Sequence, residues 1–461
     1  MVASVGRLVT AGPIVGVTAL ALGVVVGAAR PAAQSAIKEI RFSDTKLANG
    51  LRVIISEDHA APVFAIAVNY NVGSRDERKG RTGFAHLFEH MMFKGSANVG
   101  PGEHPYLIFM NGGSMNGTTN KDRTLYFEIL PANQLDLGLF LEADRMRSLE
   151  ITGPNLENQR QAVQEERRLS VDNQPYGKTF EVRDELAYEN FAYEHSVIGS
   201  MADLSAATVD DVSSFFKTYY APNNAVLSIV GDVDTKATLE KIKKYFESIP
   251  AQAAPAAVDM TEPAQTEERR TTIDDGLARL TRIDMVFKIP PSASPDSDAL
   301  QVLGTVLSNG RSSRFYETIV RQKQLSPSVN AFSQESRGPG LFTVTGIVTP
   351  GRKVEDLEAA IDAEIERVKT GAIEPWEMEK ARNNARTLLV NNLGSALGRA
   401  ITLGQDALFY DQPGRLNTTA ARIAKVTTED VQRVAKQYLV KTGRTVVITQ
   451  PKAAAPAKGG L

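Results

Sequence analysis

The chain has 461 residues, a formal net charge of -2 and a pI of about 6.3, and 42% of it is hydrophobic. This length and composition are typical of a folded protein of roughly two to four domains, and the charge balance gives no sign of a nucleic-acid-binding surface. The absence of cysteine excludes disulfides, thiolate metal sites, a cysteine nucleophile and a lipidated cysteine.

Residues 1–36 are predicted to be a targeting signal rather than part of the fold. Arg7 is the only charge before an uncharged run, residues 8–29, that is rich in Ala, Val, Leu and Gly. Small residues at positions 33–36 then provide cleavage sites. We therefore expect export and no membrane span in the mature chain. A retained membrane anchor is the alternative, because an uncharged run of this length can cross a bilayer.

The first part of the mature chain is predicted to contain strands. Residues 46–55 favour two strands joined by a turn at Asn49-Gly50, and residues 63–72 favour a third. Further strands are expected over 114–119 and 124–130, followed by helices from about 133 to 149 and from 155 to 169. The sequence between the third and fourth strands carries the most informative motif of the chain.

Residues 83–93 predict a buried helix with an apolar stripe, which Thr82 can cap and Gly95 can end. The stripe consists of residues spaced at helical intervals, namely Phe84, Leu87, Phe88, Met91 and Met92.

The other side of this helix carries His86, Glu89 and His90. Two imidazoles one turn apart can bind one ion, and the glutamate projects beside them. This H-x-x-E-H pattern is the inverted zincin motif, in which zinc lowers the pKa of a water and the glutamate takes its proton. The simpler alternative is two surface histidines on an ordinary amphipathic helix.

A catalytic zinc site needs a third protein ligand. Leu156 and Val163 are seven positions apart and define the inward face of the helix expected over 155–169. Glu166 lies about 60° from Val163 on this face, whereas Glu165 points about 160° away. This geometry selects Glu166 as the buried carboxylate. The alternative is that Glu166 is one charge of a solvated Glu-Glu-Arg-Arg run.

The chain contains an internal repeat in which matching positions keep a constant separation. A capped helix, a turn and a strand begin at Thr208 and recur from Thr427. The matching pairs are Thr208 with Thr427, Asp211 with Asp430, Val212 with Val431 and Tyr219 with Tyr438. Residues 251–272, rich in Ala, Pro, Glu and Thr, are predicted to link the two halves.

The second half is predicted to contain a strand over 278–289 and helices over 297–307, 354–370 and 374–393. Where the duplicate of the metal helix is expected, residues 298–303 contain no histidine. We therefore expect domains over 37–250 and 273–450, with a metal only in the first. The tail, residues 451–461, is predicted to be disordered.

Together these features resemble the M16 family of zinc peptidases, the pitrilysin and mitochondrial-processing-peptidase group, and most closely its bacterial half-size members. The resemblance covers nearly all of the chain after the signal. It rests on the H-x-x-E-H pattern, on the sequence separation of His90 and Glu166, and on several shorter stretches. These are Phe93-Lys94-Gly95, Met115-Asn116-Gly117-Thr118-Thr119, Glu165-Glu166-Arg167-Arg168 and the Tyr219–Asn224 run before Val230-Gly231-Asp232.

The resemblance implies an α+β fold of two similar domains, each a mostly antiparallel sheet packed against helices, forming half of a clam-shell chamber. It implies one zinc ion per chain bound by His86, His90 and Glu166, with Glu89 as the general base in peptide hydrolysis. Asn116 and Gly117 would lie on an edge strand that pairs with an extended substrate. The bacterial relatives make the periplasm the expected compartment.

Two departures from the family pattern affect the expected activity. Gln159 stands where the family often has a glutamate that supports the metal site. Active single-chain members also carry an Arg and a Tyr that bind substrate and oxyanion, but no Tyr lies seven positions after Arg321 and Pro327 stands near that place. We therefore expect a heterodimer, in which a second M16-like subunit supplies this pair. A self-sufficient homodimer is the alternative.

Two other functions compete with peptide hydrolysis. The fold also serves as a non-catalytic scaffold or assembly subunit, but such members generally lose part of the metal set, which is complete here. A peptide-binding chamber with little turnover would require Glu89 to be idle. His104 and His195 are expected to be loop or packing histidines rather than metal ligands.

Overall fold

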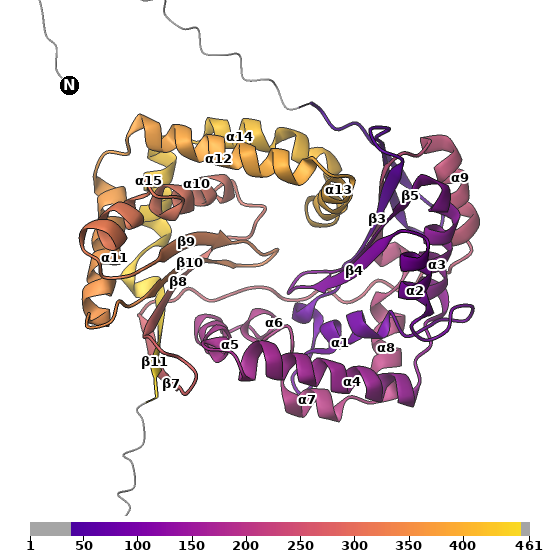
Figure 1. Ribbon diagram of the computed structural model, residues 1–461, viewed down its shortest axis with the longest axis horizontal. Helices are drawn as coiled ribbons and strands as arrows, with labels where there is room; N and C mark the ends of the chain where they lie inside the picture. The colour runs from indigo at the N-terminus through magenta and orange to yellow at the C-terminus, as the bar shows by residue number, and fades with distance from the viewer. Residues whose placement is uncertain (1–37, 453–461) are drawn as a thin grey trace, which may run out of the picture. The chain divides into compact units, whose positions relative to one another are not determined.

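The computed structural model describes residues 38–452, so the predicted signal and most of the predicted tail lie outside the described residues. The first half is built on a mixed six-stranded sheet, seen on the right of Figure 1, in the order β1-β2-β6-β3-β5-β4. Its strands are β1 Ser43–Lys46, β2 Arg52–Glu57, β3 Val63–Tyr70, β4 Ser114–Thr119, β5 Thr124–Pro131 and β6 Ala225–Gly231. Only β2 and β6 pair in parallel among these strands, so the sheet is mostly antiparallel, as expected.

The predicted Asn49-Gly50 turn is confirmed, and the structure gives its physical reason. Gly50 has φ +89°, a conformation that side chains with a Cβ rarely adopt. The amide of Asn49 donates to the carbonyls of Phe246 and Ile249, which fixes the turn against the end of a helix. Strands β1 and β2 therefore form an antiparallel hairpin.

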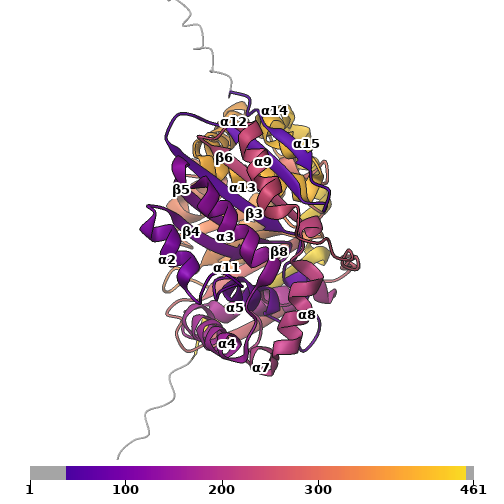
Figure 2. The same ribbon diagram turned by 90° about the vertical axis from the view of Figure 1, so that its right-hand side faces the viewer.

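Helices cover both faces of the first sheet. One face packs on the main core of the first half, which includes the apolar stripe of α1, and Figure 2 shows α3 and α9 lying along the sheet. The helices of this half are α1 Phe84–Met91, α2 Glu103–Met110, α3 Leu135–Ser148, α4 Gly153–Arg167, α5 Gly177–Ala187, α6 Phe191–Glu194, α7 Met201–Ala206, α8 Val209–Tyr219 and α9 Thr235–Phe246.

The second half repeats this arrangement around a five-stranded sheet in the order β7-β11-β8-β10-β9. Its strands are β7 Arg269–Asp275, β8 Arg282–Ile289, β9 Val329–Gln334, β10 Gly340–Ile347 and β11 Arg444–Pro451. Its helices are α10 Ser297–Ser308, α11 Val354–Thr370, α12 Pro375–Leu393, α13 Ala396–Tyr410, α14 Thr419–Lys425 and α15 Thr428–Tyr438. Thr208 and Thr427 cap their helices as expected, and each does so through a capping box with the aspartate three positions later.

The two halves exchange one helix each. Helix α5 begins at Gly177 and α13 begins at Ala396. These two starts are separated along the sequence by the same number of residues as Thr208 and Thr427, so α5 and α13 are counterparts in the two halves. Helix α13 packs on the face of the first sheet, where Leu403 joins a shared core. Residues of α5 and α6 pack against the second sheet. This exchange explains why residues 39–452 form one compact unit.

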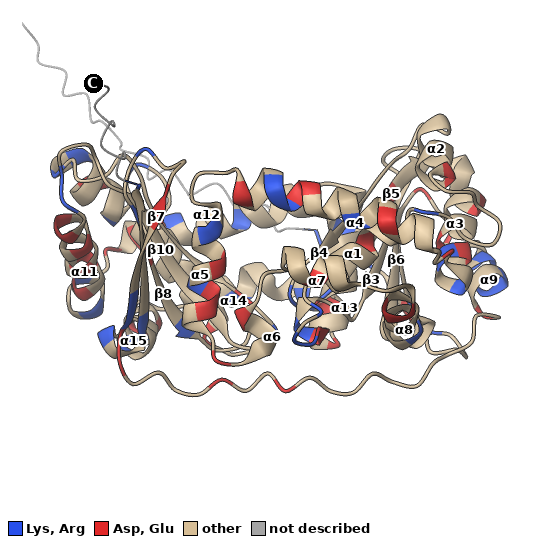
Figure 3. Ribbon diagram, turned by 90° about the horizontal axis from the view of Figure 1, so that it is seen from below, with Lys and Arg blue, Asp and Glu red and all other residues tan. Residues whose placement is uncertain are grey.

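The link between the halves is shorter than predicted. Residues 251–268 contain no helix or strand and run as an extended segment in Figure 3. Arg269–Asp275 already belongs to β7, because its residues pair in parallel with β11. The predicted tail also begins too early, since Pro451 ends β11. Within residues 38–452, no helix is both long and apolar enough to cross a membrane.

Candidate metal centre

Helix α1 carries the predicted motif, and its start is fixed by a buried acid. The N-cap is Gly83, with φ +84°, and not Thr82 as predicted. Glu77 accepts hydrogen bonds from the backbone N–H groups of Gly83 and Ala85, at 2.8 and 2.7 Å. Thr82 instead donates its hydroxyl to Asp203, which lies on α7. The helix therefore begins one residue later, on a carboxylate that satisfies its free donors.

The end of α1 also differs from the prediction. The helix stops at Met91, with Met92 as its C-cap. Gly95 lies beyond the helix with φ +104°. It directly precedes Ser96, which forms isolated β-bridges with Val99 and Leu149. The shorter helix still contains all three polar residues of the motif.

The structure brings His86, His90 and Glu166 together, as predicted. Glu166 Oε2 lies 3.6 Å from His86 Nε2 and 3.3 Å from His90 Nε2. Ligand atoms bound at the usual zinc distances in a tetrahedron would be separated by about 3.4 Å. The carboxylate oxygen lies close to this separation from each imidazole nitrogen, and the three ligand atoms lie within 4.8 Å of one another, so the group fits a zinc ion with a fourth position left for water.

The protonation of these groups suits metal binding. Burial, followed by the neighbouring His90, lowers the pKa of His86 to about 4, so its imidazole is neutral near pH 7. A hydrogen bond from His90 is the largest of the causes that lower the pKa of Glu166. Neutral imidazole and ionised carboxylate are the forms that bind zinc.

Glu166 is more exposed than the sequence predicted. Leu156 and Val163 are buried, which confirms the inward face of α4. However, 45% of the Glu166 side chain is exposed, because its carboxylate extends past the core toward the histidines. Glu165 points to solvent and pairs with Arg168 at 3.0 Å, as expected for the residue that is not a ligand.

Glu89, the expected base, is buried beside the ligands and held by β4. Thr119 Oγ1 donates to Glu89 Oε2 at 2.6 Å. Burial raises the pKa of Glu89, although this hydrogen bond opposes the shift. A raised pKa makes the carboxylate a better proton acceptor. Thr119 was not singled out from the sequence, although alternation along a strand places it on the same face as Gly117.

Asn116 and Gly117 lie in the middle of β4, which is the edge strand of the first sheet. A Cβ at Gly117 would lie 2.9 Å from Glu89 Cγ, so glycine is needed here for the base to fit. The Asn116 side chain accepts a hydrogen bond from the Gly117 N–H. Substrate binding by these two residues remains a prediction.

The two other histidines that the sequence analysis considered are buried, and each contacts a carboxylate. His104 Nε2 contacts Glu128 Oε1 at 2.5 Å, and His195 Nε2 contacts Glu77 Oε2 at 3.0 Å. His104 and Glu128 form, with Glu142, a second close group of metal-binding residue types. An arginine of α3 binds both oxygens of Glu142, and the imidazole of His104 binds one oxygen of Glu128. We therefore regard His104 as a packing histidine.

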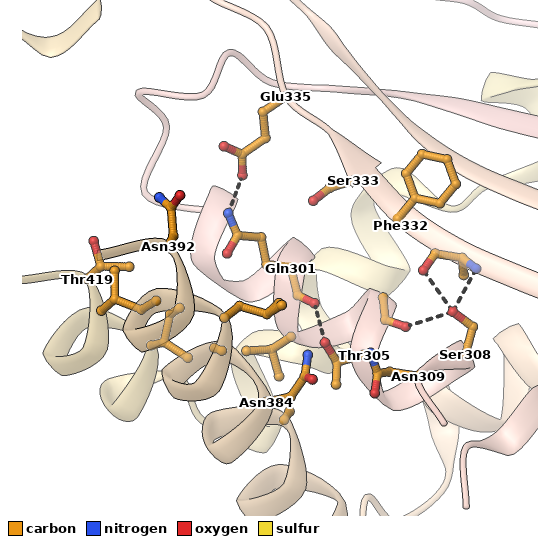
Figure 4. A pocket seen from close by; sticks show the side chains of 18 residues that line it. Gln301, Thr305, Ser308, Asn309, Phe332, Ser333, Glu335, Asn384, Asn392 and Thr419 are labelled. Atoms are coloured by element: carbon orange, nitrogen blue, oxygen red, sulfur yellow. Dashed lines mark hydrogen bonds between the residues drawn. The ribbon is translucent and has the colours of Figure 1, made fainter. Parts of the chain in front are cut away.

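The duplicate of the metal site is a pocket of about 580 Å³ in the second half, shown in Figure 4. In both halves a hydrogen bond joins the helix to the end of the edge strand. In the first half Thr119, at the end of β4, donates to Glu89 on α1. In the second half Gln301, on α10, donates to Glu335, which directly follows β9. Val302 follows Gln301 where a histidine follows Glu89. The lining residues of this pocket include no histidine.

Arg321 and the residues that follow it make local contacts. Arg321 forms an ion pair with Glu317 on the same helical turn and is largely exposed. Pro327 follows in a loop in which the hydroxyl of Ser326 donates to a backbone carbonyl. Gln159, the other departure, is buried and donates its amide to the neighbouring asparagine.

Comparisons with known proteins identify the family. The family model described as Insulinase (Peptidase family M16) matches residues 52–200, and the model described as Peptidase M16 inactive domain matches residues 206–385. The chain belongs to the M16 peptidase family. It is 31% identical over 415 residues to the zinc protease PqqE of Helicobacter pylori, covering 89% of this chain and 93% of that protein.

Solved structures of M16 proteins share the fold. The crystal structure of a protease from Helicobacter pylori matches with a TM-score of 0.85 and 30% identity, covering 89% of this chain and 100% of that one. The periplasmic protease PqqL of Escherichia coli matches with a TM-score of 0.73 and 19% identity, covering 92% of this chain and 50% of that one. The predicted α+β fold and M16 membership are therefore confirmed.

Proposed function

We propose that this chain is a zinc-dependent endopeptidase that cleaves peptides or extended protein segments. The observation that carries the proposal is the convergence of His86, His90 and Glu166 with a buried Glu89 beside them. The names of the relatives, which are zinc proteases, support it. A non-catalytic scaffold would not need to keep Glu89 buried and hydrogen-bonded next to three ligands.

The residues of the chain divide the work of hydrolysis. His86, His90 and Glu166 would hold one zinc ion, which when bound supplies a Lewis acid and a water of lowered pKa. Glu89 takes a proton from the attacking water on its carboxylate and passes it to the leaving amine. Thr119 fixes the carboxylate through its 2.6 Å hydrogen bond. The free edge of β4 pairs with the extended substrate.

We also propose that a second M16-like subunit completes the enzyme. Stabilising the developing oxyanion is usually a large part of the rate, roughly 100-fold or more for one donor. Arg321 is tied to Glu317 and has no tyrosine seven positions after it. The partner would supply the missing pair, and the mature complex would work in the periplasm after loss of residues 1–36. The alternative location is the membrane, through an uncleaved N-terminal segment.

Hydrolysis of an internally quenched peptide, measured with zinc and with Glu89→Gln as control, tests this function. The chain is assayed alone and together with any subunit that co-purifies from its host. Turnover by either preparation that the Glu89→Gln variant lacks is the expected result, and turnover only by the complex is expected for a heterodimer. A folded, zinc-bound sample without turnover in either preparation would overturn the peptidase proposal.

A further inference from the structure

His195 contacts the carboxylate that holds the start of the metal helix α1. Its Nε2 lies 3.0 Å from Glu77 Oε2, and its Nδ1 lies 2.7 Å from the carbonyl oxygen of Phe191. Glu77 in turn accepts hydrogen bonds from the backbone N–H groups of Gly83 and Ala85, at the first turn of α1. A chain of hydrogen bonds therefore runs from α6, through His195 and Glu77, to the residue that directly precedes the first histidine ligand.

The hydrogen-bond geometry indicates a proton on each ring nitrogen of His195. The carbonyl of Phe191 can only accept, so Nδ1 donates. Both oxygens of Glu77 already accept backbone N–H groups, which stabilise the ionised carboxylate, so Nε2 donates as well. His195 is therefore an imidazolium paired with a carboxylate. The pair is enclosed, because the side chains of His195 and Glu77 are 9% and 0% exposed.

The groups around His195 favour its charged form. Burial alone would lower the pKa of His195, but the hydrogen bond to Glu77 outweighs burial and raises it. Burial likewise raises the pKa of Glu77, so both shifts keep a proton between the two side chains. Lys121, on the turn between β4 and β5, opposes the charge of His195, but its ammonium is paired with Asp184 at 2.7 Å. The ring of Phe191 stacks on the imidazole, with ring centres 4.3 Å apart.

The ligand His86 depends on the position of its own helix. A metal-binding imidazole usually donates its second ring nitrogen to a carboxylate or a carbonyl, which fixes the ring. Nδ1 of His86 is buried and has no hydrogen-bond partner among residues 38–452. The ring is therefore placed by the backbone of α1, whose first turn is held by Glu77.

Loss of the proton from His195 would weaken this support. Glu77 would then be a buried carboxylate without a charged partner, which is a strongly unfavourable state. The carboxylate is expected to bind a proton or to move toward solvent, and either change weakens its hydrogen bonds to the first turn of α1. His86 would then be held less firmly at the metal position.

The segment that carries His195 also touches the second half of the chain. Two residues earlier, Tyr193 packs on the second sheet, where its hydroxyl accepts a hydrogen bond from the N–H of Gly338. Four residues later, the carbonyl of Gly199 accepts a hydrogen bond from the arginine that follows the third ligand. Residues 193–199 therefore connect the second sheet, the start of α1 and the end of α4, and Figure 1 shows α6 between the second sheet and α1.

We propose that His195 is a positioning residue of the metal centre: its imidazolium holds Glu77 against the first turn of α1 and so keeps His86 in place for the metal. The proposal rests on the zinc site of the proposed function. The pKa of His195 is raised, so the support is fully present below the ordinary pKa of histidine, about 6.5, and is lost as the pH rises through the raised value. The zinc site should therefore weaken at alkaline pH through a residue that binds neither metal nor substrate.

The first measurement is the charge of His195 in the unaltered, metal-free chain. The chain has five histidines, so the imidazole nitrogen resonances of a histidine-labelled sample can be assigned by single substitutions. Near pH 7 both ring nitrogens of His195 are expected to be protonated, whereas burial keeps His86 and His104 neutral, with pKa values of about 4 and 3. A neutral His195 at this pH would overturn the proposal.

The second measurement is the affinity for zinc as a function of pH, determined by competition with a chelator and without any peptide. Glutamine can donate one N–H to Glu77 but carries no charge. His195→Gln is therefore expected to bind zinc about tenfold more weakly than the wild type near pH 6.5. This difference should shrink as the pH rises through the pKa of His195. Protonation of the ligands affects both proteins alike and cancels in the ratio.

His59→Gln is the matched control, because His59 also contacts two carboxylates, Asp232 at 2.7 Å and Glu57 at 3.5 Å, but its side chain is 61% exposed. It is expected to leave zinc affinity unchanged at every pH, and thermal unfolding verifies that each variant is folded. Equal zinc affinity of the wild type and a folded His195→Gln variant, or a difference that stays constant with pH, would overturn the role of His195 while leaving the zinc site intact. A wild type that binds no zinc would instead overturn the proposed function.

Discussion

The metal site of the first half and the pocket of the second half are built from corresponding elements but differ in chemistry. Helices α1 and α10, strands β4 and β9, and helices α4 and α12 occupy equivalent places. The inward residues of α4 and α12 follow one another at the same intervals along the two helices. They are Leu156, Gln159 and Val163 on α4 and Met378, Ala381 and Ala385 on α12. This register places Leu388 where α4 carries Glu166.

The comparison shows that the fold does not require the metal residues. The second half keeps its sheet, its helix packing and a pocket of similar position, although Gln301, Val302 and Leu388 stand in the places of a base and two ligands. The catalytic chemistry therefore depends on a few side chains, and single substitutions should separate it from stability.

The edge strands differ as well. Ser308 on α10 binds both the N–H and the carbonyl of Ala331, in the middle of β9. These backbone groups are therefore not free to pair with an added strand. At Gly117 of β4 the N–H donates to the side chain of its neighbour Asn116, which an incoming strand can displace more easily than a hydroxyl held by a facing helix. An extended peptide thus has a better edge in the first half.

The largest expected effect is the loss of the base. Glu89→Gln should lower kcat by roughly 100- to 10,000-fold, because the amide cannot accept the proton of the attacking water. Zinc content should stay the same, since Glu89 is not a ligand. The counterpart change, Gln301→Glu, should leave kcat unchanged. Equal losses in the two variants would contradict the assignment of the reaction to the first half.

Removal of a ligand should abolish metal binding rather than proton transfer. Glu166→Gln should release zinc at concentrations where the wild type retains it, because a neutral amide is a far weaker ligand. Elemental analysis after gel filtration measures this. Leu388→Gln, the corresponding change on α12, should keep the full zinc content. Retention of zinc by Glu166→Gln would rule out Glu166 as the third ligand.

A smaller effect is expected when the base is kept but its support is removed. Thr119→Val deletes the hydrogen bond to Glu89, a bond to a charged group that is typically equivalent to about a tenfold change in rate. The kcat should fall by about this factor while zinc content is preserved. Thr118→Val is the control, since the Thr118 hydroxyl binds Arg123 instead. An unchanged kcat in Thr119→Val would show that Glu89 is positioned without it.

The core of the first half contains buried carboxyl groups where the core of the second half has apolar side chains. The smallest of the expected effects follows from this difference. Glu128 on β5 pairs in register with Ile66, whereas the matching pair of the second half is Val344 with Met285. At the separation that relates the two halves, Glu142 on α3 similarly corresponds to a buried isoleucine on α11. Burial raises the pKa of Glu128 and Glu142 to about 7.

The folded protein binds the protons of these two carboxyls more tightly than the unfolded chain does. Their contribution to the free energy of unfolding is therefore fully present below pH 4.5 and is lost as the pH rises to about 7. His104 acts in the opposite sense, since burial lowers its pKa to about 3. Glu128→Gln should therefore gain stability relative to the wild type between pH 5 and pH 7, by at most about 1.4 kcal/mol per pH unit. Urea denaturation measures the difference, with Glu150→Gln, at an exposed position after the end of α3, as control. A pH-independent difference would contradict the raised pKa of Glu128.

Much of the site could be predicted because it depends on local periodicity. The positions of His86, Glu89 and His90 follow from one helix, and the helical angle alone separates Glu166 from Glu165. The constant separation of the repeated positions also predicts the correspondence of α8 with α15.

Other features could not be predicted, because they depend on contacts between distant segments. Glu77, and not Thr82, accepts the hydrogen bonds of the first N–H groups of α1, and its position there depends on the tertiary fold. The exchange of α5 and α13 between the halves and the hydrogen bond from Thr119 to Glu89 are likewise tertiary. The link predicted over 251–272 proved shorter because residues of β7 find their partners in β11, far along the chain.

The most direct test of zinc-dependent hydrolysis is a zinc titration of the metal-free active preparation, with peptide hydrolysis and bound zinc measured on the same samples. We predict that activity rises in proportion to bound zinc and reaches its plateau at about one ion per chain, with Glu89→Gln binding the same amount without turnover. Activity without zinc, or turnover by the zinc-loaded Glu89→Gln variant equal to that of the wild type, would contradict this mechanism.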